Sequence, residues 1–167
     1  MSSSSKVNEL RLRVEELYAR EVILLQSGRY EEWLALFSPS LRYLLPTRTT
    51  VTERDAMVPR DATAYFDDDR ESLEIRVRRM SNEHAFTEVP PSVLRYFIQV
   101  LLVESDDLGA ITATSNEAVY IHRGSRPVQT FTASRVDVLE PRGEDLAIRS
   151  RTVVLDQRTV GNLSFFF

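Results

Sequence analysis

Residues 94–102 read Leu-Arg-Tyr-Phe-Ile-Gln-Val-Leu-Leu and place apolar side chains at every second position. This alternation predicts a long strand with one apolar face. The residues expected on that face are Leu94, Tyr96, Ile98, Val100 and Leu102. The stretch follows Pro90-Pro91, where the apolar period of the chain changes from 3.6 residues to 2. The change indicates helices before the proline pair and a sheet after it.

Downstream of this strand the chain repeats the same pattern between short turns. Strands are predicted over residues 111–121, 128–139, 146–155 and 160–167. Turn-forming residues lie before the strands that start at 111, 128 and 146, at positions 106–109, 124–127 and 141–144. Successive strands joined by short turns predict an antiparallel meander.

Upstream, three segments have helical spacing. The first helix carries an apolar stripe and ends near Gly28. Its stripe consists of Val7, Leu10, Val14, Leu17, Leu24 and Leu25. A second, short helix is predicted from Tyr30 to about Phe37, with Pro39 limiting it. The strand 41–45 follows.

A third helix is predicted from Asp67 to Met80, after an irregular, arginine-containing loop over residues 46–66. Its apolar stripe would be Leu73, Val77 and Met80. The acids at its start are interpreted as capping and dipole partners of a helix, in preference to a divalent-cation site. The elements together predict an α+β fold in which the helices lie on the concave face of a curled, mainly antiparallel sheet. The expected shape is a cone with room for a cavity.

The composition fits one domain, which we expect to span residues 1–167 with a disordered tail at 1–5. A net charge of −4 argues against nucleic-acid binding. The chain has no cysteine, which excludes disulfides, thiolate metal ligands and thiol nucleophiles. No apolar run has the length of a membrane span, and the start lacks the apolar segment of a signal peptide, so a cytoplasmic protein is expected.

Arginine and phenylalanine usage is unusual. Of 21 basic residues, all but Lys6 are arginine, which indicates either interface use or genomic codon bias. The sequence stops on Phe165, Phe166 and Phe167. Rings in water favour aggregation, so either the core of this domain or a partner chain must cover them.

The sequence offers few catalytic candidates. It lacks a Gly-x-Ser-x-Gly elbow and a glycine-rich phosphate loop, and its two histidines, His84 and His122, have no metal-ligand spacing. An acid–base enzyme in the cone would need a buried pair such as His84 with Asp137 or Glu117.

Several stretches, in order, resemble the small (beta) subunit of aromatic-ring-hydroxylating dioxygenases, the Rieske non-haem iron oxygenases. The matching stretches are residues 28–37 (GRYEEWLALF), 42–46 (RYLLP), 67–73 (DDDRESL), 88–92 (EVPPS), 155–157 (LDQ) and 162–166 (NLSFF). The stretches at 93–99 and 82–86 depart from the family pattern.

The resemblance implies a cone fold like those of nuclear transport factor 2 and scytalone dehydratase, and an assembly of three alpha and three beta subunits. In that family the alpha subunit holds the Rieske iron–sulfur cluster and the mononuclear iron. This chain would then hold no catalytic residue, cofactor or metal, and would associate with alpha subunits and other beta subunits.

Three functions are weighed. The first is a non-catalytic beta subunit that stabilises alpha subunits during cis-dihydroxylation of an aromatic ring with O₂ and NADH-derived electrons. The second is a stand-alone cone-fold dehydratase or isomerase that uses acid–base residues in its cavity. The third is a binding or scaffold module. For subunit contacts we expect Arg48, Arg70, Phe165, Phe166 and Phe167, because bidentate arginines and aromatic rings are common at interfaces.

Overall fold

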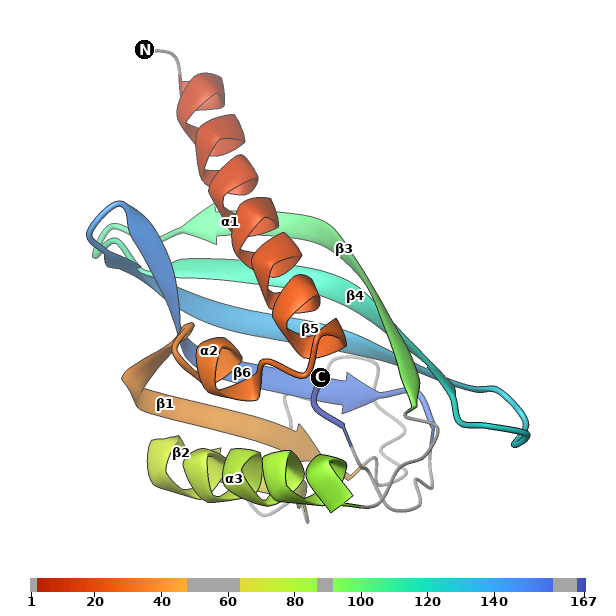
Figure 1. Ribbon diagram of the computed structural model, residues 1–167. Coiled ribbons are helices and arrows are strands. Elements are labelled where there is room, and N and C mark those ends of the chain that lie inside the picture. Colours follow the sequence, from red (N-terminus) through yellow and green to blue (C-terminus); the bar gives the residue numbers. More distant parts are fainter. Residues whose placement is uncertain (1–2, 48–63, 87–91, 158–164) are drawn as a thin grey trace.

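The computed structural model describes residues 3–47, 64–86, 92–157 and 165–167. Within these ranges it has three helices and six strands (Figure 1). The helices are α1 (Ser3–Gln26), α2 (Tyr30–Leu34) and α3 (Arg70–Phe86). The strands are β1 (Phe37–Pro46), β2 (Ala64–Asp69), β3 (Val93–Ser105), β4 (Ile111–His122), β5 (Gln129–Arg142) and β6 (Asp145–Leu155).

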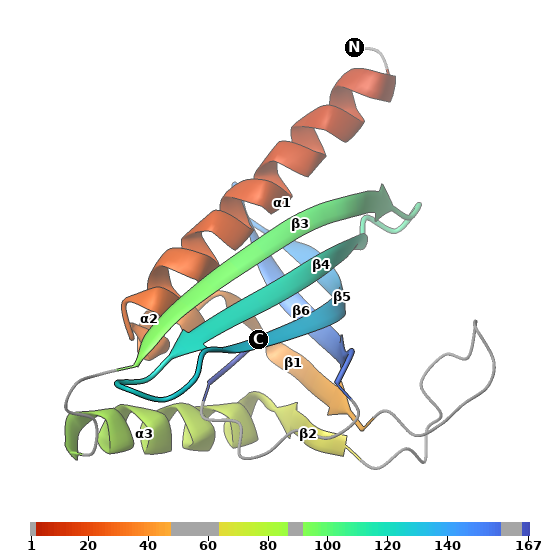
Figure 2. The ribbon, with the colours of Figure 1, turned by 90° about the vertical axis from the view of Figure 1, so that its right-hand side faces the viewer.

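The six strands form one sheet in the order β2-β1-β6-β5-β4-β3. The pair β1–β6 is parallel, and every other neighbouring pair is antiparallel. Figures 1 and 2 show a strongly twisted sheet with α1 running along one face of β3–β5 and α3 lying beside β1 and β2. The predicted α+β class and the antiparallel meander of β3 to β6 are confirmed.

The end of α1 follows the sequence prediction closely. Gly28 has a φ of +67°, and its N–H donates to Leu25 O while Arg29 N–H donates to Leu24 O. This is a Schellman motif, which suits glycine because it requires the left-handed region. The predicted stripe of α1 is buried from Val14 to Leu25, whereas Val7 is exposed.

The three acids at 67–69 correct the prediction for the third helix. They end strand β2, and α3 begins only at Arg70. Asp69 alone caps the helix, because its Oδ1 accepts from Ser72 N–H at 2.9 Å. Asp67 instead pairs with Arg42 of β1. The predicted stripe of α3 is confirmed, since Leu73, Val77 and Met80 are buried.

Strand β1 is longer than the segment predicted at 41–45, and α2 is shorter than predicted. The helix ends at Leu34, and Pro39 lies inside the strand rather than stopping the helix. Its place is tolerated because the pairing of β1 with β6 is interrupted between Phe37 and Arg42.

The buried face of β3 also differs from the face that the alternation of apolar residues predicts. The register of β3 against β4 shifts between Val100 and Leu102. Val103 is therefore buried, while Leu101 and Leu102 are about half exposed. A bulge moves every later side chain to the opposite face, and alternation alone does not reveal it.

The two chain ends also differ from expectation. Helix α1 already begins at Ser3, within the segment 1–5 expected as a tail. Of the strand predicted over 160–167, the described residues Phe165–Phe167 are not in a strand, and the rest lies outside the described residues. These three residues dock by aromatic and hydrogen-bonding contacts instead. Among the described helices, none is long and apolar enough to cross a membrane.

Candidate functional site

A cluster of five charged side chains fills the space between α1 and the sheet. Glu21 comes from α1, Glu117 from β4, Arg135 and Asp137 from β5, and Arg151 from β6. Each is at most 2% exposed. Buried charges are costly unless they are paired, so the geometry of this charge cluster decides whether it stabilises the fold.

Arg151 is the centre of the charge cluster. Its Nε and Nη2 donate to the two oxygens of Asp137, both at 2.9 Å. Nη2 also donates to Glu21 Oε2 at 3.1 Å, and Nη1 donates to Glu21 Oε1. Nη1 further donates to the main-chain oxygen of Phe167 at 2.9 Å. One guanidinium therefore joins α1, two strands and the last described segment.

Arg135 has a looser set of partners. Its Nη2 donates to Glu21 Oε2 at 2.9 Å, and its Nη1 reaches Glu117 Oε2 at 3.4 Å. Its Nε lies 3.2 Å from Asp137 Oδ2 but does not have hydrogen-bond geometry. The guanidinium also lies over the ring of Tyr18, 4.2 Å from the centroid, which is a cation–π contact.

The three carboxyl groups are not equivalent. Burial alone would raise the pKa of Glu21 and of Asp137, but the charges of Arg135 and Arg151 outweigh it and lower both pKa values. For Glu117 burial prevails over the same two arginines and raises the pKa. Glu21 and Asp137 balance the two guanidinium groups, so ionised Glu117 would be an excess buried negative charge.

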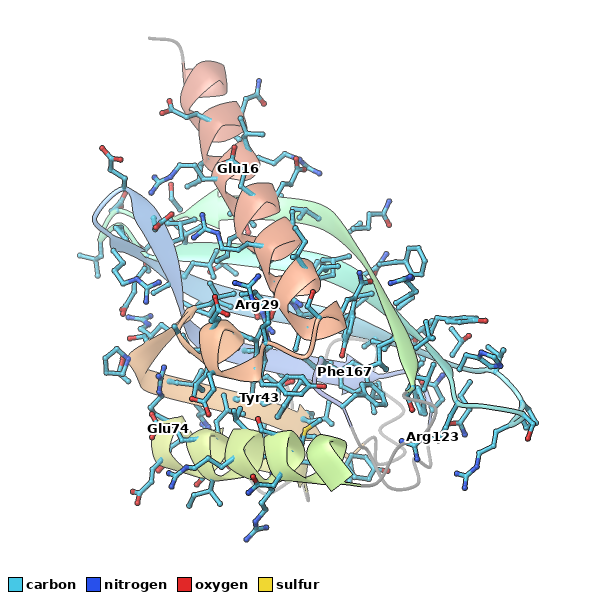
Figure 3. All side chains as sticks on the ribbon, viewed as in Figure 1. Glu16, Arg29, Tyr43, Glu74, Arg123 and Phe167 are labelled. Atoms are coloured by element: carbon cyan, nitrogen blue, oxygen red, sulfur yellow. The ribbon has the colours of Figure 1, made fainter. Side chains whose placement is uncertain are left out.

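Residues Phe165–Phe167 close the interior beside the charge cluster. The Tyr43 hydroxyl donates to Phe167 O at 2.8 Å, and the Tyr96 hydroxyl donates to Phe166 O at 2.9 Å. Figure 3 shows Tyr43 and Phe167 close together between the two long helices. Burial raises the pKa of both tyrosine hydroxyls, which keeps them protonated as donors.

The rings of this segment pack into the aromatic core. Phe166 stacks on Trp33 at 4.5 Å between centroids, and Phe165 lies 5.3 Å from Phe131. Trp33 is itself connected to the charge cluster, because its Nε1 donates to Glu21 Oε1 at 2.9 Å. The three terminal rings are at most 3% exposed. Of the two covers that the sequence allows, the core of this domain is the one observed.

The other residues singled out in the sequence lie apart from the charge cluster. Arg70, at the start of α3, donates to Leu34 O and Phe37 O at 2.9 and 3.0 Å and pairs with Glu74. Arg48 and the side chain of His84 lie outside the described residues. The interface role expected for Arg48, Arg70 and the three phenylalanines stays a prediction.

The acid–base pairs left open by the sequence, His84 with Asp137 or Glu117, stay untested because the side chain of His84 lies outside the described residues. Asp137 is held by Arg151 through both oxygens, and its lowered pKa makes it a weak base.

The sequence interpretation did not single out Glu21, Arg135 or Arg151, although the apolar pattern of their elements contains a signal for them. On β5, Arg135 and Asp137 lie between Ala133 and Leu139 at every second position, so all four residues share the buried face. Charges placed in the apolar register of a central strand indicate a buried ion pair. Glu21 lies four residues from both Leu17 and Leu25, so it is a charged residue at a position of α1 where the helical spacing predicts an apolar one.

An open cleft of about 1090 Å³ lies between α1 and strands β3 to β5. Tyr18 and Glu117, both buried, belong to its lining, and Glu15 and Phe97 are exposed members of it. Apolar side chains supply much of the remaining lining, which includes Val22, Tyr96, Ile98, Val100 and Ala133.

The charge cluster does not suit a metal ion. All three of its carboxylates are paired with guanidinium groups, and a cation would meet two positive charges there. Elsewhere in the described ranges, no three histidine or acidic side chains gather in a way that could hold a metal. The chain has no cysteine for an iron–sulfur cluster.

Fold and site together define a cone-shaped α+β protein whose interior is occupied by arginine–carboxylate pairs and aromatic rings. Residues 20–162 match the family described as ring hydroxylating beta subunit. The chain belongs to this family of ring-hydroxylating beta subunits.

Individual relatives agree with this assignment. The beta subunit of benzene 1,2-dioxygenase from Pseudomonas putida is 34% identical, over 95% of this chain and 89% of the relative. The solved beta subunit of benzoate 1,2-dioxygenase from Burkholderia mallei superposes with a TM-score of 0.72 at 21% identity, covering 92% of this chain and 95% of that one.

The cone fold extends beyond the family. A putative scytalone dehydratase from Novosphingobium aromaticivorans superposes with a TM-score of 0.64 at 11% identity, covering 93% of this chain and 89% of that one. Similarity at this level concerns the fold alone. It confirms the cone shape that the sequence predicted.

Proposed function

We propose that the protein is the non-catalytic beta subunit of an aromatic-ring-hydroxylating dioxygenase and that it stabilises the catalytic alpha subunits. Membership in the beta subunit family and the similarity to a benzene dioxygenase subunit support this function. The observation that carries the non-catalytic part is Arg151, which binds the carboxylates of Glu21 and Asp137 and so leaves them unavailable as bases.

The oxygen chemistry belongs, in this proposal, to an alpha subunit that holds a Rieske cluster and a mononuclear iron. The complex would add both atoms of O₂ to an aromatic ring as a cis-dihydrodiol, with electrons from NADH. The proposed stoichiometry is three alpha and three beta subunits. In that assembly the task of this chain is mechanical, because a buried network of charge-assisted hydrogen bonds gives a rigid body against which other chains can pack.

For the contacts with other subunits we propose Arg48 and Arg70, with the three terminal phenylalanines supporting that surface from the core. Arg70 is suited to the role because part of its side chain, 29%, is exposed while two main-chain carbonyls hold it in place. A pre-oriented guanidinium loses little entropy when it binds a carboxylate of a partner.

The proposal is tested by co-expression with a neighbouring reading frame that encodes a large chain with Cys-x-His and Cys-x-x-His spacings. We expect the two chains to co-purify, the iron to follow the large chain, and ring oxidation to need both chains plus a reductase. The full chain purified alone should hold no iron and turn over no aromatic compound. Failure to associate with any iron-containing chain, or turnover by this chain alone, would overturn it.

A further inference from the structure

The cleft between α1 and the sheet contains polar groups whose hydrogen bonding the fold leaves incomplete. Glu117 Oε1 is buried and makes no hydrogen bond with any described residue, and the buried Tyr18 hydroxyl, although it interacts with the nearby Asp137 carboxylate, makes no hydrogen bond of good geometry. Both side chains belong to the cleft lining, and both residues are 2% exposed. A buried polar atom without a partner costs about 1–3 kcal/mol, so this arrangement calls for a reason other than stability.

The surroundings of the two groups resemble a binding pocket more than a packing defect. The volume of about 1090 Å³ is just above the usual size of small-molecule sites. Apolar side chains such as Val22, Ile98 and Ala133 form much of the lining, which also includes Arg11, Glu15 and Asn116. An apolar cleft with a few polar groups is the usual composition of a pocket that orients a small organic molecule.

The protonation of the two groups limits what they can bind. Burial raises the pKa of the Tyr18 hydroxyl, which keeps its proton. Burial likewise raises the pKa of Glu117, and the two nearby arginines are already balanced by Glu21 and Asp137. The Tyr18 hydroxyl is therefore a hydrogen-bond donor, and burial favours the uncharged form of Glu117, which can also donate. An anionic ligand would add a further negative charge beside three buried carboxyl groups.

We propose that this cleft is a binding site for a small, uncharged, largely apolar organic molecule that carries a carbonyl or hydroxyl oxygen. Tyr18 and Glu117 hydrogen-bond that oxygen, and the apolar part of the molecule lies against the apolar walls. The site lies within one chain and involves no bond-making step. The inference goes beyond the proposed structural function and does not depend on it, because a scaffold needs no such pocket.

The test compares two probes of nearly equal shape, 1-indanone and indane, which differ by one carbonyl oxygen. Isothermal titration calorimetry on the full chain should show one site for 1-indanone and binding of indane that is about five- to tenfold weaker, as expected for one or two hydrogen bonds. Benzoate, the charged probe, should not bind. Equal affinity for 1-indanone and indane, or no heat from either, would overturn the proposal.

Substitutions separate the site from general effects on folding. Tyr18→Phe removes a hydroxyl that makes no hydrogen bond of good geometry, so its melting temperature should stay close to that of the wild type. Its affinity for 1-indanone should fall about fivefold while its affinity for indane stays the same. Val22→Trp, which fills the cleft from α1, should abolish binding of both probes. Unchanged 1-indanone binding by folded Tyr18→Phe and Val22→Trp would show that the compound binds elsewhere.

Discussion

Arg151 on β6 and the main-chain oxygen of Phe167 are joined by a 2.9 Å hydrogen bond, although the same guanidinium already holds two carboxylates. The bond ties the last described segment to the charge cluster. Packing of the phenylalanine rings and pairing of the buried charges therefore form one connected interior.

The first prediction concerns this connection. Arg151→Met keeps an unbranched apolar stem but removes the guanidinium, which leaves Glu21 and Asp137 buried with Arg135 as their remaining cationic partner. Breaking one side of a buried ion pair costs about 3–5 kcal/mol, and we expect urea unfolding to show a loss in that range. Arg149→Met is the matched control, because Arg149 is exposed on the same strand and should change stability by less than about 0.5 kcal/mol. Similar losses for both variants would contradict the structural role of the charge cluster.

The aromatic side of the interior gives a second prediction. Phe166→Ala removes a fully buried ring that stacks on Trp33 at 4.5 Å and meets Tyr30 edge-on at 5.7 Å. The resulting cavity should lower the free energy of unfolding by about 3–5 kcal/mol. Leu108→Ala serves as the control, since Leu108 is 95% exposed in the turn between β3 and β4. A loss below about 1 kcal/mol for Phe166→Ala would mean that Phe165–Phe167 do not close the core.

Arg70 provides a test of the proposed subunit contact. Arg70→Ala should weaken co-purification with the large chain in size-exclusion chromatography, whereas Arg78→Ala, at an exposed position of the same helix, should not. Losing the bonds to Leu34 O and Phe37 O should also cost about 1–3 kcal/mol in urea unfolding, so both measurements are needed. A stable Arg70→Ala variant that assembles like the wild type would remove Arg70 from the contact surface.

The sequence predicts the fold well where burial follows a simple period. The antiparallel meander and the stripes of α1 and α3 were predictable because one face of each element is apolar. The prediction was wrong where the same residues suit two different elements. Asp67–Asp69 look like a helix start, but pairing of β2 with β1 and the ion pair of Asp67 with Arg42 hold all three acids in a strand.

The candidate site was less predictable because it depends on contacts between distant residues. Asp137 and Glu117 were recognised only as candidate acid–base partners of His84, and their different roles arise from arginines on two strands. The excess of arginine gave no way to separate buried Arg135 and Arg151 from those on the surface. The final phenylalanines required a cover, but only the fold shows that Trp33, Phe131 and Tyr43 supply it.

The last prediction uses the raised pKa of Glu117. A carboxyl group whose pKa is higher in the folded than in the unfolded chain stabilises the fold below the unfolded value, near 4.5, and loses that contribution as pH rises through the folded value. Glu117→Gln stays uncharged at every pH. Its stability relative to the wild type should therefore increase from pH 4 to pH 8, by up to about 1.4 kcal/mol per pH unit in the titrating range. Glu104→Gln, at an exposed position of β3, should show no such trend in urea unfolding. The opposite slope for Glu117→Gln would mean that Arg135 governs Glu117 more strongly than burial does.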